Sequence, residues 1–227
     1  MTVPRLSAAA ATAEVALRDP KLGRIIELAG PFRVTKTRRT ESAFFASLVE
    51  SIMYQQLAGA AAAAIHGRFR ALFDGELAPE ALLAMPDERI RGAGVSGAKL
   101  ASIKDLAAKV ADGTVPLDGI EKLPDDEIVA RLSQVRGIGR WTAEMFLIFD
   151  LRRLDVWPVD DYGVRGGWAI AHGLAEVPKP KELEPLGDRF RPWRTIAAWY
   201  CWRAVHLSRT GGLPAVRRRR KPALPPG

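Results

Sequence analysis

The chain has 227 residues, a formal net charge of +8 and one cysteine. A chain of this length buries roughly 70% of the surface that its unfolded form exposes, so a stable core needs no disulfide. Cys201 alone excludes an internal disulfide and a four-cysteine iron–sulfur cluster, and the three histidines show no close ligand spacing. The cysteine count and histidine spacing therefore predict no transition-metal site. Because no apolar run is long enough for a signal peptide or a membrane span, we expect an intracellular protein.

The two ends of the chain differ in what they predict. Residues 7–18 and 20–28 favour two short helices, and residues 32–40 form a basic segment, either a solvated loop or a phosphate contact. Residues 208–227 contain six basic residues and no acid. They lack apolar periodicity, so we predict a disordered tail. The basicity of the chain lies mostly in this tail and is compatible with a polyanionic partner.

From Glu41 onward a clean helical stripe of apolar residues leads to an amide pair, Gln55 and Gln56, followed by Leu57 and a second helical segment after Gly59. Two long helices therefore meet near the glutamines. The pair either satisfies backbone groups at the helix break or enters DNA to fill the gap that a displaced nucleotide leaves. Further along, Ser96 is explained as the N-cap of another helix.

Residues 124–149 predict a helix-hairpin-helix. A helix opens at Asp125, Gly137 and Gly139 form a tight turn, and a second helix begins at Arg140. The two glycines suit positive backbone dihedrals and close approach by another molecule. Backbone N–H groups at the second helix start attract anions such as phosphate. A plain helical hairpin with a glycine loop is the alternative.

The segment after this hairpin contains an apolar loop and then two acids, Asp160 and Asp161, followed by Tyr162. The last strong helix, from Pro192 to Leu207, is apolar on nearly all sides and should be buried. No strand alternation of convincing length is present, so we predict an all-α protein.

The stretch GIGRWTAEMF, followed about twenty residues later by PVDDY, resembles the helix-hairpin-helix (HhH-GPD) DNA glycosylase superfamily, nearest to its AlkA-type 3-methyladenine DNA glycosylase II group. The resemblance implies a two-lobed helical fold with the active-site cleft between the lobes and without an N-terminal β-rich domain. One lobe would combine residues 1–42 and 158–207, and the other would span 43–157.

In this family the second acid of the motif is catalytic, which implies Asp161, and leaves Asp160 to cap the next helix. An acidic helix start without chemistry is the alternative. Asp150 and Asp155, in a charged turn, are predicted to be solvated. Superfamily members that also cleave the DNA backbone use a lysine at the position of Trp141, so a monofunctional enzyme without lyase activity is expected.

The resemblance also implies where DNA and the damaged base bind. The predicted base pocket, in which aromatic faces attract a cationic base, comprises Trp141, Tyr162, Trp202 and Met145. Core packing is the alternative for Trp202. The DNA-binding hairpin comprises Gly137, Ile138, Gly139, Arg140 and Thr142, and Gln55 or Gln56 is the DNA wedge. Backbone carbonyls of Ser133, Val135 and Ile138 would bind Na⁺ or K⁺; no other cofactor is expected.

These expectations define a monomeric, cytoplasmic, bacterial-type enzyme that associates with the nucleoid through DNA. It would flip alkylated bases of the 3-methyladenine and 7-methylguanine type out of double-stranded DNA, hydrolyse the N-glycosidic bond and leave an abasic site for base excision repair. A non-catalytic helix-hairpin-helix DNA-binding protein is the alternative. The single cysteine and Trp141 count against mismatch and oxidised-base enzymes that use a cluster or a lysine.

Overall fold

A computed structural model describes residues 7–33, 40–57 and 59–213 of the chain. Residues 34–39 of the predicted basic connector and 214–227 of the predicted tail lie outside them. The chain divides into two compact units, one formed by Met1–Val34 with Arg153–Gly227 and the other by Thr35–Arg152. These boundaries differ from the expected ones at 42/43 and 157/158.

The second boundary lies earlier than expected because residues 153–157 are bound to the end of the chain. The N–H of Thr195 donates to the Leu154 carbonyl at 3.0 Å, and the N–H of Val156 donates to the Thr195 hydroxyl at 3.0 Å. Trp157 packs edge-on against Trp168, with ring centroids 6.0 Å apart. These contacts assign the loop to the unit of the chain ends.

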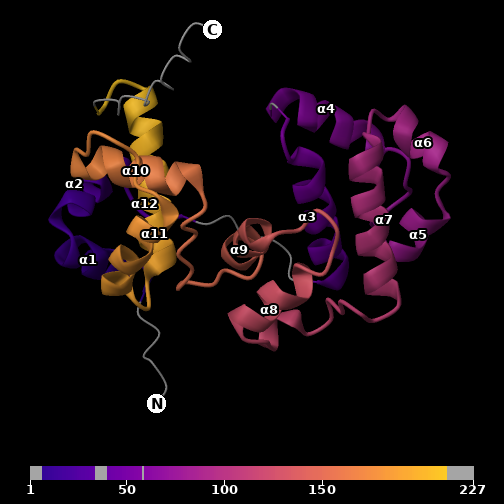
Figure 1. Cartoon of the computed structure of the whole chain (residues 1–227), viewed down its shortest axis with the longest axis horizontal. Coiled ribbons are helices and arrows are strands. Elements are labelled where there is room, and N and C mark those ends of the chain that lie inside the picture. The colour runs from indigo at the N-terminus through magenta and orange to yellow at the C-terminus, as the bar shows by residue number, and fades with distance from the viewer. Residues whose placement is uncertain (1–6, 34–39, 58, 214–227) are drawn as a thin grey trace, which may run out of the picture. The chain divides into compact units, whose positions relative to one another are not determined.

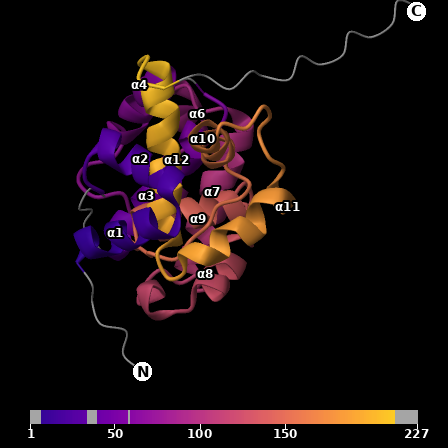
Figure 2. The ribbon, with the colours of Figure 1, turned by 90° about the vertical axis from the view of Figure 1, so that its left-hand side faces the viewer.

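The unit of the chain ends is built around one buried helix, α12, which contacts α1, α2 and α10 (Figures 1 and 2). Its elements are α1 (Ala8–Arg18), α2 (Pro20–Ala29), α10 (Tyr162–His172), α11 (Pro180–Leu183), the 3₁₀ helix η2 (Glu184–Phe190) and α12 (Arg194–Arg209). Helix α12 reaches Arg209, inside the segment predicted to be disordered. Its buried side chains include Ile196, Tyr200 and Cys201.

Helices α10 and α12 approach each other closely at a glycine. A Cβ added to Gly167 of α10 would lie 1.8 Å from the carbonyl oxygen of Cys201 in α12. Real side chains do not reach such distances, so the crossing requires glycine. The buried face of α10 also places its first turn, which carries the acidic motif, against α12.

We predict that Gly167→Ala destabilises the fold by roughly 1–3 kcal/mol, because the added methyl group must push two packed helix backbones apart. Chemical denaturation of both proteins measures this loss. Gly166→Ala is the matched control, since a Cβ at Gly166 meets no neighbouring atom within 4 Å. Equal stability of Gly167→Ala and the wild type would contradict the crossing geometry.

The other unit contains α3 (Glu41–Tyr54), α4 (Gly59–Arg70), α5 (Pro79–Ala84), α6 (Asp87–Gly92), α7 (Gly97–Ala111), the 3₁₀ helix η1 (Ile120–Lys122), α8 (Asp125–Leu132) and α9 (Arg140–Phe149). Helix α3 packs against α4, α7 and α9, and α8 packs against α9 (Figure 1). The predicted apolar stripe of α3 is buried, and Phe44 meets Phe146 of α9 edge-on at 5.4 Å.

The fold class predicted from sequence is confirmed: the described residues form helices, turns and loops and contain no β-strand. Ser96 caps α7 as expected, accepting the Lys99 N–H at 3.4 Å. None of the helices in residues 7–33, 40–57 and 59–213 has the length and apolar character needed to cross a membrane.

Candidate active site

Asp161 occupies the N-cap of α10, and its side chain is held by two donors on one oxygen. The backbone N–H of Val164 donates to Oδ1 at 2.7 Å, and the indole N–H of Trp202 in α12 donates to the same atom at 2.9 Å. The prediction that Asp160 caps this helix was therefore wrong. A turn closed by the Asp161 N–H on the Pro158 carbonyl places Asp161, with extended dihedrals, directly before the first helical residue.

Gly163 permits the contact between Asp161 and Trp202. A Cβ at this position would lie 2.8 Å from Cδ1 of Trp202 and 3.0 Å from the Asp161 carboxylate. Gly163 was not predicted as a site residue, although it directly follows the acidic motif. Trp202 is half-buried and bound to the carboxylate, so apolar packing alone does not explain it.

Tyr162 follows Asp161 and is 53% exposed, an unusual position for a large aromatic side chain. The guanidinium of Arg165 lies 5.5 Å from its ring centroid. An acid, an exposed tyrosine and an indole therefore cluster at the start of α10. This cluster offers one carboxylate beside two aromatic side chains.

The predicted hairpin is present in the other unit, between α8 and α9. Gly137 has a φ of +80°, and a Cβ there would lie 2.8 Å from the Ser102 hydroxyl, so both dihedral and packing require glycine. Gly139 differs from the expectation, because its φ is −98°. A Cβ at Gly139 would meet no protein atom within 4 Å, so the fold itself does not demand glycine there.

The backbone of the hairpin, rather than its apolar side chains, faces outward. Val135 and Ile138 are buried, whereas Gly137 and Gly139 are exposed. Helix α9 begins after Gly139, which has no side chain to cap it. Arg140 is exposed and pairs with the buried Glu144 at 3.0 Å. The start of α9 therefore presents the positive end of the helix dipole and backbone N–H donors at the surface.

Thr142, predicted as part of the DNA-binding hairpin, is only 5% exposed. It lines a cavity of about 440 Å³ whose other walls are Ser51, Tyr54, Gln55, Gln56, Trp141 and Met145. Two predicted base-pocket residues, Trp141 and Met145, thus share a cavity within this unit. The other two, Tyr162 and Trp202, lie in the unit of the chain ends.

Ser51 and Tyr54 were missed as pocket residues by the sequence analysis. Ser51 and Tyr54 are three residues apart and share one side of α3, and Gln55 follows as the C-cap of this helix. Tyr54 meets His66 of α4 edge-on at 5.9 Å. The apolar stripe of α3 could have predicted these two pocket residues. Ser51 and Tyr54 lie outside the stripe, on the face of α3 that lines the cavity.

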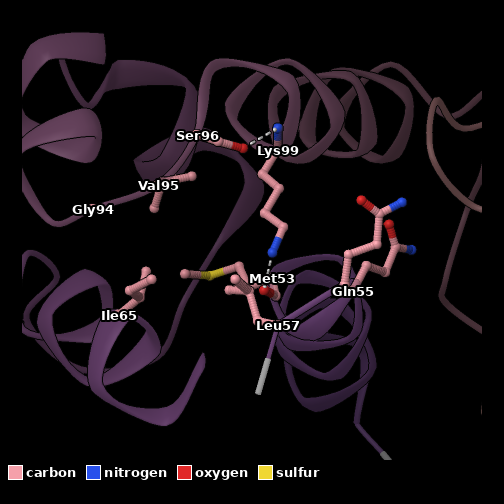
Figure 3. A pocket seen from close by; sticks show the side chains of 9 residues that line it. Met53, Gln55, Leu57, Ile65, Gly94, Val95, Ser96 and Lys99 are labelled. Atoms are coloured by element: carbon pink, nitrogen blue, oxygen red, sulfur yellow. Dashed lines mark hydrogen bonds between the residues drawn. The ribbon is translucent and has the colours of Figure 1, made fainter. Parts of the chain in front are cut away.

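The two glutamines at the end of α3 have different environments. The Gln55 amide donates to the Gly137 carbonyl at 2.9 Å, so this side chain joins α3 to the hairpin turn. Gln56 is exposed and has a φ of +57°, a conformation that non-glycine residues adopt rarely. Figure 3 shows the side of this corner that faces α7.

The prediction that Asp150 and Asp155 are solvated was wrong. Asp150 is 8% exposed and accepts a hydrogen bond from Ser47 at 2.9 Å; burial, and secondarily the charge of Glu50, raise its pKa to about 6. Asp155 binds Arg194 at 2.6 Å and Arg191 at 3.0 Å. The sequence shows nearby charges but not the tertiary partners Ser47 and Arg194, which lie far from these acids in the chain.

A metal ion could be bound by side chains or by backbone carbonyls. In the part of the chain that the structure describes, no group of three or more His, Cys, Asp or Glu side chains is placed to hold a metal ion. Of the three carbonyls suggested to bind a monovalent cation, that of Val135 accepts the Ile138 N–H at 3.0 Å.

Comparison with known proteins agrees with this geometry. Residues 49–192 match the HhH-GPD superfamily of base excision DNA repair proteins. DNA-3-methyladenine glycosylase 1 of Schizosaccharomyces pombe is 35% identical over 193 residues, 84% of each chain. These matches define a helix-hairpin-helix repair protein, and the chain belongs to the HhH-GPD superfamily.

Solved structures give the same result. The S. pombe 3-methyladenine DNA glycosylase in complex with abasic DNA superposes with a TM-score of 0.76 and 35% identity, covering 85% of this chain and 94% of that one. A DNA-3-methyladenine glycosidase from Bacillus halodurans gives a TM-score of 0.76 and 37% identity, covering 86% and 88%.

Proposed function

We propose that the protein is a monofunctional DNA glycosylase that removes alkylated bases of the 3-methyladenine and 7-methylguanine type from double-stranded DNA. The observation that carries the proposal is the Asp161 carboxylate, held by Val164 and Trp202 beside the exposed Tyr162. The relatives named as 3-methyladenine glycosylases support the substrate class.

Cleavage of an N-glycosidic bond passes through a transition state with oxocarbenium character. In this proposal Asp161 faces the deoxyribose of the flipped nucleotide and stabilises the positive charge that develops there. Two unit charges ~4 Å apart at an effective dielectric near 20 attract by roughly 4 kcal/mol, equivalent to about three decades of rate. Asp161 also orients the attacking water and accepts its proton.

A purine nucleotide alkylated at N3 or N7 carries a positive charge on the base and loses the base without a general acid, so one carboxylate suffices for this reaction. Electron-rich faces of Trp141, Tyr162 and Trp202 would attract such a base, by ~0.5–2 kcal/mol for each contact. Because Trp141 stands where lyases have a lysine, no Schiff base forms and the abasic strand stays intact.

The hairpin supplies binding that does not depend on base sequence. Backbone N–H groups at Gly137, Gly139 and the start of α9 would bind a DNA phosphate, with Arg140 beside them. The open space at Gly139 supports this role, since the protein itself does not fill it. A Na⁺ or K⁺ held by the carbonyls of Ser133, Val135 and Ile138 would supply positive charge toward the same phosphate.

Gln56 is the better candidate for the wedge that fills the gap in the DNA stack. It is exposed, whereas the amide of Gln55 is bound to the Gly137 carbonyl. Gln55 would then line the base cavity. A DNA substrate is compatible with the proposed cytoplasmic, nucleoid-associated location.

The function is tested by incubating the protein with methylated duplex DNA and identifying released bases by mass spectrometry. We expect free 3-methyladenine and 7-methylguanine, and DNA strands that break only after alkali treatment. Strand cleavage without alkali would contradict the monofunctional assignment. Lesion binding without base release would favour a non-catalytic DNA-binding protein, the alternative that the hairpin alone would support.

A further inference from the structure

One polar stripe of α7 touches both of the DNA-contacting elements in its unit. Lys99, Ser102, Asp105 and Lys109 follow one another at intervals of three, three and four residues, so they share one face of the helix. Lys99 reaches the end of α3, and the other three residues reach the hairpin turn. Neither set of contacts is used by the proposed chemistry.

The contact with α3 is a single hydrogen bond at its last turn. The Lys99 ammonium donates to the Met53 carbonyl at 2.6 Å (Figure 3). Carbonyls in the last turn of a helix lack intrahelical partners and carry the negative end of the helix dipole, so a cation is favourable there. Partial burial of Lys99 lowers its pKa.

The corner that follows, Gln55–Leu57, is only weakly held by backbone hydrogen bonds among the described residues. Its own backbone hydrogen bonds, from the N–H of Gln55 and of Leu57, are 3.4 Å long, beyond the usual range. A cavity of about 210 Å³ lies behind the corner, lined by its three residues with Met53, Ile65 and Lys99 among others. Leu57 is 39% exposed. The corner therefore depends on side chains for its position.

The contacts with the hairpin turn are made by the other end of the stripe. The Arg136 N–H donates to the Asp105 carboxylate at 2.7 Å, and the Lys109 ammonium donates to the Gln134 carbonyl at 2.7 Å. Ser102 packs beneath Gly137. Gln55 connects the corner directly to the hairpin turn, because its amide donates to the Gly137 carbonyl at 2.9 Å.

We propose that this stripe holds the Gln55–Leu57 corner and the hairpin turn in a fixed register, and that Lys99 is the positioning residue for the corner. The inference rests on the proposed function, in which the turn binds phosphate and the corner enters the DNA stack. A DNA duplex would then meet a pre-set pair of contacts, and phosphate binding would place Gln56 for insertion without a further ordering cost.

The test replaces Lys99 with methionine, which keeps the length of the side chain and removes the donor. The probe is a duplex with 2-aminopurine beside a tetrahydrofuran abasic-site analogue, since insertion unstacks the fluorophore and raises its emission. We expect Lys99→Met to bind undamaged duplex as the wild type does, to give a much smaller emission rise at saturation, and to release 7-methylguanine about tenfold more slowly in single-turnover assays. Lys99→Arg should restore both signals.

Lys104→Met is the matched control on the same helix. The Lys104 ammonium also donates to helix-terminal carbonyls, those of Leu83 and Met85 at 3.0 and 2.8 Å, but it does not touch the corner. This variant should match the wild type in emission and rate. An equal loss in Lys104→Met, or a wild-type emission rise in Lys99→Met, would overturn the proposal.

Asp105→Ala provides a second test if Lys99→Met does not fold, because alanine removes the oxygen that accepts the Arg136 N–H and the Lys109 ammonium. Loosening the hairpin turn should weaken binding to undamaged duplex while the emission rise at saturation persists. Unchanged binding to undamaged duplex together with a lost emission rise would refute the assignment of Asp105 to the turn and of Lys99 to the corner. If the wild type shows the emission rise but releases no base, the proposed function fails while the register between corner and turn stands.

Discussion

Asp161→Asn is expected to reduce the single-turnover rate of base release by about a thousandfold, because it removes the negative charge that would stabilise the oxocarbenium ion. The amide oxygen can still accept the hydrogen bonds that Val164 and Trp202 donate to Oδ1. Asparagine is also as good an N-cap as aspartate. The measurement is release of 7-methylguanine from a duplex in excess enzyme.

The control for this substitution is Asp160→Asn, which makes the same change one residue earlier at an exposed side chain. It should retain the wild-type rate. Asp161→Asn should bind an abasic-analogue duplex and melt at the wild-type temperature, which separates lost chemistry from lost structure. A wild-type rate in Asp161→Asn would remove Asp161 from the reaction.

Asp150→Asn is expected to stabilise the protein by roughly 3 kcal/mol at pH 8 and to have little effect near pH 4. The pKa of Asp150 is about 6 in the folded protein, above the ordinary value of 3.8, chiefly because of burial. A raised carboxyl pKa means that the folded state holds the proton more tightly. Its contribution to stability is complete below about pH 4 and is lost as the pH rises through about 6.

Asparagine removes the buried charge and can still accept the hydrogen bond from Ser47. Denaturation curves of the variant and the wild type between pH 4 and 8 measure the difference, since titration of all other groups is common to both. Asp74→Asn, at an exposed residue of the same unit, should show no such pH-dependent gain. A constant difference between Asp150→Asn and the wild type across this range would contradict the assignment.

Much of the fold follows from local pattern. The apolar stripe of α3 and the start of α9 at Arg140 were predicted correctly, because helical periodicity and a glycine turn are properties of neighbouring residues. The cap of α10 was assigned one residue too early. Both Asp160 and Asp161 are good caps, and the turn on Pro158 together with the Trp202 contact selects the second.

The candidate site was predictable only in part. The acidic motif and Trp141 can be recognised from the sequence by residue type. The position of Tyr54 in the pocket and the hydrogen bond from Gln55 to Gly137 depend on which helices meet. The same reason accounts for Asp150. Arg152 and Arg153 follow it closely in the sequence, whereas the side chains that act on it in the fold are Ser47 and Glu50 of α3.

The amino-acid sequence by itself determined that the chain is helical, that it contains a glycine hairpin followed by an acid and an aromatic, and that no lysine stands at position 141. These are properties of spacing and residue type over short distances. Only the tertiary structure decided which acid caps α10, which glutamine is tethered and which carboxyl is buried. Those outcomes depend on contacts between residues far apart in the chain, such as Lys99 with Met53 and Asp161 with Trp202.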